Sequence, residues 1–181
     1  MSVAPDYVEP VVGWRAWLVV RECETFRLQS VVYYTLWLPG RELVARCLHR
    51  AWLLRFPGRR PSEHSPPFAR CRCGIYAARE IETAASYLDV LGRSEKLAVH
   101  RVIGQVSLWG EVLECAQGWR ASHAYPAAIY VPTKGHPHRL RVKAAEEIAL
   151  ALTEYGVPVE LLDCGTPEEA VAALGSASVY G

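Results

Sequence analysis

The sequence contains no apolar run long enough to cross a membrane as a helix. Its longest apolar stretches, at 17–20 and 31–37, are far shorter than the roughly 20 residues that such a helix needs. Residues 1–10 carry Asp6 and Glu9 and lack the basic start and apolar core of a secretory signal. We therefore expect a cytoplasmic protein with no membrane partner, in which the six cysteines stay reduced.

Lysine is nearly absent, with three lysines against 17 arginines, and charge is distributed unevenly. Residues 41–72 hold eight arginines and two glutamates, whereas the chain after Lys143 holds seven acidic residues and no basic one. A planar guanidinium pairs with phosphate or carboxylate and stacks on aromatic rings, so the arginine-rich part could attract an anionic partner. Docking of the two halves against each other would account for the same charge pattern, and a GC-rich genome for the arginine bias.

The sequence also lacks a glycine-rich phosphate loop, a nucleophile elbow and an HExxH motif. It does contain material for a core, since 51% of its residues are apolar and only 22% are charged, which excludes a disordered chain. A length of 181 residues fits one domain. We expect a single domain over 1–181, with a β-rich core at 13–131 that includes a Cys/His loop and an acidic helix–strand–helix end at 139–175.

Residue periodicity predicts strands along most of the chain and helices mainly near its end. Alternation and β-branched or aromatic residues predict strands at 14–21, 26–37, 73–78, 102–112, 119–131 and 157–162, the last of them buried. Helical spacing and capping residues predict helices at 81–91, 145–155 and 167–174. The first two strands should form a hairpin, and 102–112 should pair antiparallel with 119–131, where Pro126 forces a bulge or an edge. The expected fold is α+β, a mostly antiparallel sheet or partial barrel with one central helix and a C-terminal helix–strand–helix.

The strongest local signal for chemistry is Cys71-Arg72-Cys73-Gly74. Two thiolates separated by one residue can bind one soft cation, and the glycine that follows them allows a tight turn of the backbone. Upstream lie Cys47 and His64, the latter within a proline-rich loop at 57–70 that has few apolar anchors. The predicted ligands of a structural zinc ion are Cys47, His64, Cys71 and Cys73, three sulfurs and one nitrogen of the types that zinc prefers. The alternative is a set of ordinary buried cysteines beside an exposed histidine. The isolated cysteines Cys23, Cys115 and Cys164 are expected in the core.

The arginine-rich segment also contains Trp52, between Arg50 and Arg55. An aromatic residue among arginines is typical of a surface for single-stranded nucleic acid or a nucleotide, although an interior tryptophan flanked by surface arginines has the same sequence. The residues predicted to contact an acidic partner are Arg50, Trp52, Arg55, Arg59, Arg60 and Arg72.

The segment that begins at Cys71 resembles two groups of known proteins. The stretch Gly74-Ile75-Tyr76-Ala77-Ala78, with a helix reaching Ala85 and Tyr87, resembles the central element of ADP-ribosyltransferases. That resemblance implies an NAD pocket lined by Tyr76 or Tyr87, with Tyr34 in the first NAD-contacting motif. The family's late strand carries a glutamate, and 119–131 contains none. The Cys-x-Cys-Gly-Ile-Tyr-Ala motif also resembles an uncharacterised group of small bacterial proteins over roughly residues 13–131, which implies no activity.

Two functions from different classes follow from these patterns. The leading hypothesis is a zinc-stapled binding module that contacts an acidic partner, either nucleic acid or an acidic protein segment, through its arginine-rich face. The alternative is an NAD- or nucleotide-binding protein related to ADP-ribosyltransferases but without catalytic activity.

Overall fold

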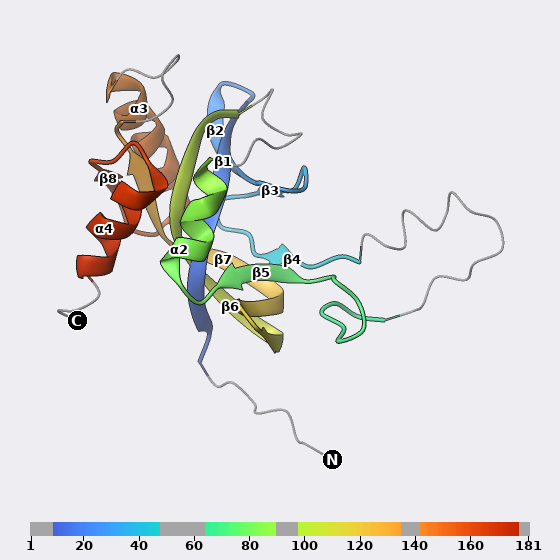
Figure 1. The fold of residues 1–181 in the computed structure, drawn as a ribbon. Coiled ribbons are helices and arrows are strands. Elements are labelled where there is room, and N and C mark those ends of the chain that lie inside the picture. The colour runs from blue at the N-terminus through green and yellow to red at the C-terminus, as the bar shows by residue number, and fades with distance from the viewer. Residues whose placement is uncertain (1–8, 48–63, 90–97, 135–141, 178–181) are drawn as a thin grey trace.

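The computed structural model describes residues 9–47, 64–89, 98–134 and 142–177. Its longest strands are β1 (Val11–Glu22), β2 (Thr25–Ser30), β6 (Ala98–Cys115) and β7 (Gly118–Pro132). Both predicted antiparallel pairs are present, since β1 pairs with β2 and β6 pairs with β7. The register of the second pair shifts next to Pro126, which confirms the expected bulge. The α+β fold with a mostly antiparallel sheet is thus confirmed (Figure 1).

The predicted strand at 26–37 is wrong in its second half. β2 ends at Ser30, the chain turns through 31–35, and a two-residue strand, β3 (Leu36–Trp37), then pairs back onto β2. The turn returns the Trp37 ring to the core, where it packs edge-on against Trp17 with 5.6 Å between ring centroids. The Trp37 indole N–H donates to the Ser30 hydroxyl (3.1 Å), which fixes this arrangement.

The sheet curves back on itself through two more short strands, β4 (Leu43–Val44) and β5 (Ile75–Ala78). Both pair antiparallel with β7. β5 also meets β1 through a single residue pair, Trp14 and Ala78. The hydrogen-bonded order β1–β6–β7–β5 therefore returns to β1, so the sheet is ring-like without being a closed barrel.

The helical elements pack against both faces of the sheet. They are α2 (Ile81–Ala85) with the 3-10 turn η1 (Ser86–Leu88), α3 (Val142–Leu152) with η3 (Thr153–Tyr155), and α4 (Pro167–Ala177). The part of the predicted helix beyond Asp89 lies outside the described residues. Thr166 caps α4 as predicted, because its hydroxyl accepts a hydrogen bond from the Glu169 amide (3.2 Å). No helix in the described ranges is long and apolar enough to span a membrane.

The strand predicted as buried at 157–162 is β8 (Val159–Leu162), and the burial prediction is wrong. β8 pairs parallel with β7, and Glu160 and Leu161 are exposed. Among the described strands β7 is its one partner, so β8 lies at an edge of the sheet, where side chains remain open to solvent.

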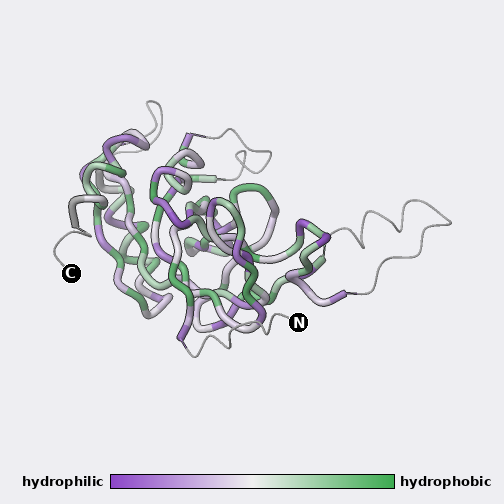
Figure 2. Tube along the Cα trace, turned by 60° about the horizontal axis from the view of Figure 1, so that its bottom comes forward, coloured by the Kyte–Doolittle hydropathy of each residue, from purple (hydrophilic) through white to green (hydrophobic). Residues whose placement is uncertain are grey.

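Alternate residues of β1 belong to two different cores. Trp17 and Val19 lie in a core that includes α3, whereas Ala16 and Leu18 lie in a second core with α2 and α4. Hydrophobic segments accordingly run through the strands and the helices alike (Figure 2). In Figure 1, α3, β8 and α4 lie at the left of the view, and the strands β4 and β5 lie at the right.

Candidate metal centre

Two short strands on one edge of β7 determine where the predicted metal ligands lie. Along this edge, β4 ends at Val44, the amide of the next residue, Ala45, donates to Ser122 O (2.7 Å), and β5 begins at Ile75, opposite Ala121. Because β6 occupies the other edge of β7 along this stretch, β4 and β5 are successive segments of one edge. Residues 46–74, of which the structure describes 46–47 and 64–74, connect β4 to β5 in the sequence, and we call them the excursion. Cys47 lies at its start and the 71–73 turn at its end, and we call the place where these two ends meet its neck.

All four predicted ligand atoms converge at this neck. The three cysteine sulfurs and one ring nitrogen of His64 lie within 4.8 Å of one another. Cys47 Sγ is 3.7 Å from Cys71 Sγ, and Cys73 Sγ is 3.4 Å from His64 Nε2. In a tetrahedral site, bonds of about 2.3 Å to sulfur and 2.0 Å to nitrogen separate neighbouring ligand atoms by about 3.5–3.8 Å. The cluster therefore has the spacing needed to hold one metal ion.

The alternative, ordinary buried cysteines beside an exposed histidine, expects a different burial from the one observed. Cys73 is buried, but Cys47, Cys71 and His64 are all half-buried. The His64 ring stacks on Phe68 with 4.7 Å between ring centroids, so it is held in place next to the sulfurs. Sequence reasoning found all four residues because ligand chemistry depends on residue type.

The two thiols of the 71–73 turn differ in acidity. Burial, together with the nearby Cys71 sulfur, raises the pKa of Cys73 to about 11. Desolvation also opposes ionisation of Cys71, but hydrogen bonds from the backbone of Cys73 and Arg72 and from the thiols of Cys73 and Cys47 outweigh it and lower the Cys71 pKa. The turn thus favours one thiolate, and a bound cation would be needed to hold a second.

Side chains from the sheet support the 71–73 turn, a feature that sequence reasoning missed. Arg120 on β7 donates to the backbone carbonyls of Cys71 and Cys73, the latter at 3.1 Å. Gly74 follows the turn with a φ of 120°, and a Cβ there would lie 3.1 Å from the Cβ atoms of Arg120 and Pro67. Arg120 lies in the segment Gly118-Trp119-Arg120-Ala121, and nothing in the sequence indicates that it contacts residues more than forty positions earlier.

Most of the residues predicted to contact an acidic partner, namely Arg50, Trp52, Arg55, Arg59 and Arg60, lie outside the described residues. Arg72 is described and exposed, as are Arg46 and Arg70, which precede Cys47 and Cys71. None of these three arginines forms an ion pair with another residue in the described part of the chain. Their positive charges therefore lie open to solvent beside the candidate metal ligands.

The tyrosines of the NAD alternative lie on three different elements. Tyr34 is in the 31–35 turn, Tyr76 in β5 and Tyr87 in η1, with exposed fractions of 65%, 45% and 41%. The Tyr76 hydroxyl donates to Arg72 O (2.9 Å), and the Arg120 guanidinium lies 5.8 Å from the Tyr76 ring centroid. Tyr76 is thus engaged in supporting the 71–73 turn.

Of the three cysteines expected in the core, Cys164 is buried, Cys115 is half-buried and Cys23 is exposed. The expectation for Cys23 is wrong because Cys23 and Glu24 form the two-residue turn between β1 and β2. Both have positive φ values, 43° and 64°, which match the twist of a tight hairpin and place Cys23 at its tip.

Comparison with models of protein families, with curated proteins and with solved structures finds no match for this chain.

Proposed function

We propose that this chain is a binding module in which a zinc ion closes the neck of the excursion, and the arginines of the excursion contact an acidic partner. The convergence of Cys47, His64, Cys71 and Cys73 within 4.8 Å is the observation that carries the proposal. Three thiolates and one imidazole suit zinc, and four protein ligands leave no open position for a reacting water. The ion would therefore have a structural role.

A zinc ion at this place would join both ends of the excursion to the edge of β7. The ligands come from the start, the middle and the end of residues 46–74, so one ion would constrain the segment at several points. The excursion holds seven arginines and a single acidic residue, Glu63. Holding such like charges together costs free energy unless an anionic partner neutralises them. Phosphates of a nucleic acid and carboxylates of an acidic protein segment share this chemistry.

Zinc content tests the first part of the proposal. Protein purified without chelator should contain about one zinc per chain, and Cys73→Ser should lose it. The variant should melt more than about 5 °C lower, because each ~1 kcal/mol lost shifts Tm by about 2–4 °C at this size and a structural ion contributes its binding free energy to folding. Cys23→Ser, at an exposed turn, is the control and should retain the metal. Wild-type protein without bound metal would refute the metal centre.

Fluorescence polarisation tests the second part, with a labelled single-stranded oligonucleotide and a labelled oligoglutamate peptide as probes. Affinity for at least one probe should fall as salt rises, because neutralised phosphates or carboxylates release their counterions. Replacing Arg55, Arg59 and Arg60 together by Ala should weaken binding, as should removal of zinc, whereas Arg21→Ala on the β1–β2 hairpin should not. Absence of binding to both probes at low salt would contradict a contact with an acidic partner.

A further inference from the structure

We propose that Arg120 and Tyr76 are positioning residues that hold the 71–73 turn in its ligand geometry, so that the metal binds a largely preformed site. The inference rests on the metal centre proposed above. It concerns two residues outside the ligand set, both on strands of the sheet.

Sheet side chains bind all three backbone carbonyls of the turn. Arg120 Nη1 donates to Cys71 O and to Cys73 O, the latter at 3.1 Å. The Tyr76 hydroxyl donates to Arg72 O at 2.9 Å. Because each of the three carbonyls accepts a hydrogen bond from a side chain of the sheet, the sheet fixes the backbone conformation of the turn.

The direction of these carbonyls decides where the neighbouring amides point. Because a trans peptide unit is planar, a carbonyl held on one side turns the following N–H to the other side. The carbonyls of Cys71 and Arg72 face Arg120 and Tyr76, so the amides of Arg72 and Cys73 face away from them. On that side both amides can donate to the Cys71 sulfur, whose pKa they help to lower. Donors of this kind stabilise a thiolate ligand and fix its direction.

Arg120 itself is held rigidly. It lies on β7, opposite Tyr76 of β5 on one side and Leu113 of β6 on the other, and is only 8% exposed. Its Nε donates to Cys115 Sγ (3.3 Å), and in the described part of the chain no carboxylate pairs with its guanidinium. A buried guanidinium is unfavourable unless its donors are satisfied, and here the ligand turn satisfies them.

The test measures zinc affinity by competition with a chromophoric chelator, and the visible spectrum of the cobalt(II)-substituted protein. Arg120→Gln should weaken zinc binding about tenfold or more, the range expected when a partner of a ligand is removed. It should also change the thiolate-to-cobalt absorption. Arg120→Lys, which keeps one charged donor, should recover part of the loss, and Tyr76→Phe should shift affinity in the same direction by a smaller factor. Arg79→Gln is the control, because Arg79 pairs with Glu114 away from the turn.

The outcomes separate this inference from the metal centre itself. If the wild type binds no zinc, the metal centre fails and this inference with it. If the wild type binds zinc and Arg120→Gln has the same affinity and cobalt spectrum, the positioning role is overturned, even where the metal-free variant melts at a lower temperature. If Arg120→Gln does not fold, Tyr76→Phe decides: unchanged affinity overturns the inference, and weakened affinity at unchanged metal-free Tm supports it.

Discussion

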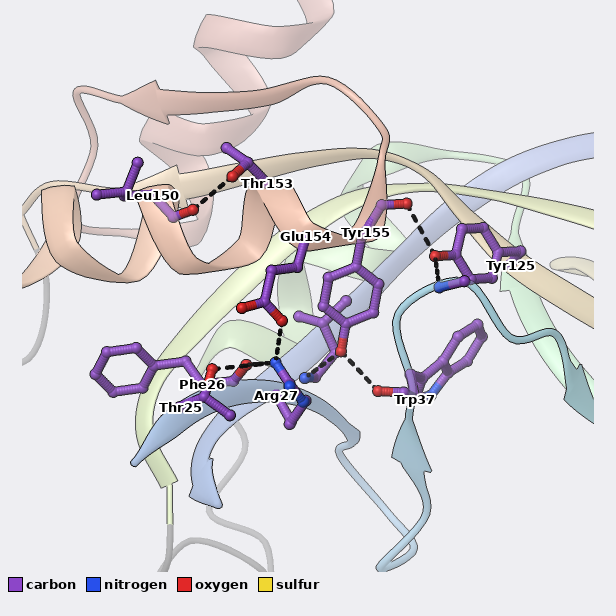
Figure 3. A network of polar contacts seen from close by, with 11 residues as sticks. Thr25, Phe26, Arg27, Trp37, Tyr125, Leu150, Thr153, Glu154 and Tyr155 are labelled. Carbon is purple, nitrogen blue, oxygen red and sulfur yellow. Dashed lines mark hydrogen bonds and ion pairs between the residues drawn. The ribbon is translucent and has the colours of Figure 1, made fainter. Parts of the chain in front are cut away.

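Among single residues, Tyr155 joins the 3-10 turn η3, which follows α3, to the strands β2 and β3. Its hydroxyl donates to Trp37 O (2.6 Å) and accepts from the Leu28 amide (2.9 Å) (Figure 3). Its own carbonyl accepts from the Tyr125 hydroxyl (2.8 Å), which accepts from the Gly40 amide (2.7 Å). Burial raises the pKa of Tyr155 to about 12, because an ionised phenolate in this place would be desolvated.

Tyr155→Phe should lower the free energy of unfolding by about 1–3 kcal/mol at pH 8, because the Leu28 amide and the Trp37 carbonyl lose a buried partner. An unfolded tyrosine ionises near pH 10, so the raised pKa makes the protonated hydroxyl stabilising below about pH 10. This contribution is lost as pH rises toward 12. Urea unfolding between pH 8 and 11.5 should therefore show a steeper fall for the wild type than for the variant. Tyr33→Phe, at an exposed position, is the control, and parallel curves for wild type and Tyr155→Phe would contradict the prediction.

At the level of elements, the important feature is that β4 and β5 share one edge of β7. The strands are short, but both are aligned by the same long partner, so the 71–73 turn and Cys47 are brought to one place. Gly74 joins the turn to β5 in a backbone conformation, φ 120°, that side chains rarely adopt.

Gly74→Ala should weaken zinc retention and lower the free energy of unfolding by about 1–3 kcal/mol, the usual cost of a strained backbone conformation. The added Cβ would also press on the Cβ atoms of Arg120 and Pro67, both 3.1 Å away. Gly175→Ala in α4 is the matched control: its Cβ would meet nothing within 4 Å, and it should be neutral or stabilise the helix by about 0.5–1 kcal/mol. Zinc remaining after dialysis against a chelator, and urea midpoints, measure both effects. Zinc retention equal to wild type would show that the turn tolerates a side chain here.

At the level of the whole molecule, the hairpin of β6 and β7 is the scaffold for every other strand except β2 and β3. In an ADP-ribosyltransferase the late strand would supply a glutamate, but β7 contains no acidic residue. Ser122 and His123 lie there instead, and their side chains contact each other at 2.8 Å. The Ser122 hydroxyl also accepts from the Glu111 amide (2.9 Å), so it is part of the β6–β7 pairing.

We therefore expect no release of nicotinamide from NAD by the purified protein, alone or with cell lysate as acceptor. Transfer of this type needs a fixed carboxylate to stabilise the developing positive charge on the ribose. Chromatographic detection of nicotinamide, compared with a Tyr87→Ala variant that leaves the metal ligands untouched, measures this directly. Release that depends on Tyr87 would favour the NAD alternative, and Glu111 and Glu114 on β6 would be the first residues to mutate.

The sequence by itself determined the properties that depend on residue type and on near neighbours. The ligand set Cys47, His64, Cys71 and Cys73 follows from the chemistry of thiols and imidazole, and the structure brings all four together. The antiparallel pairing of β6 with β7 follows from period-two alternation on both sides of a tight turn. The first signal depends on residue type and the second on near neighbours, so both can be recognised without knowing the fold.

The tertiary structure decided what depends on contacts between distant residues. Nothing local indicates that β4 and β5 lie on one edge, that Arg120 supports a turn far earlier in the chain, or that β8 lies at an exposed edge. Nor does residue periodicity indicate the turn after Ser30, which brings Trp37 of β3 against Trp17 of β1. Pairing at long range depends on which surfaces meet when the whole chain packs, and that information is shared among segments rather than carried by any one of them.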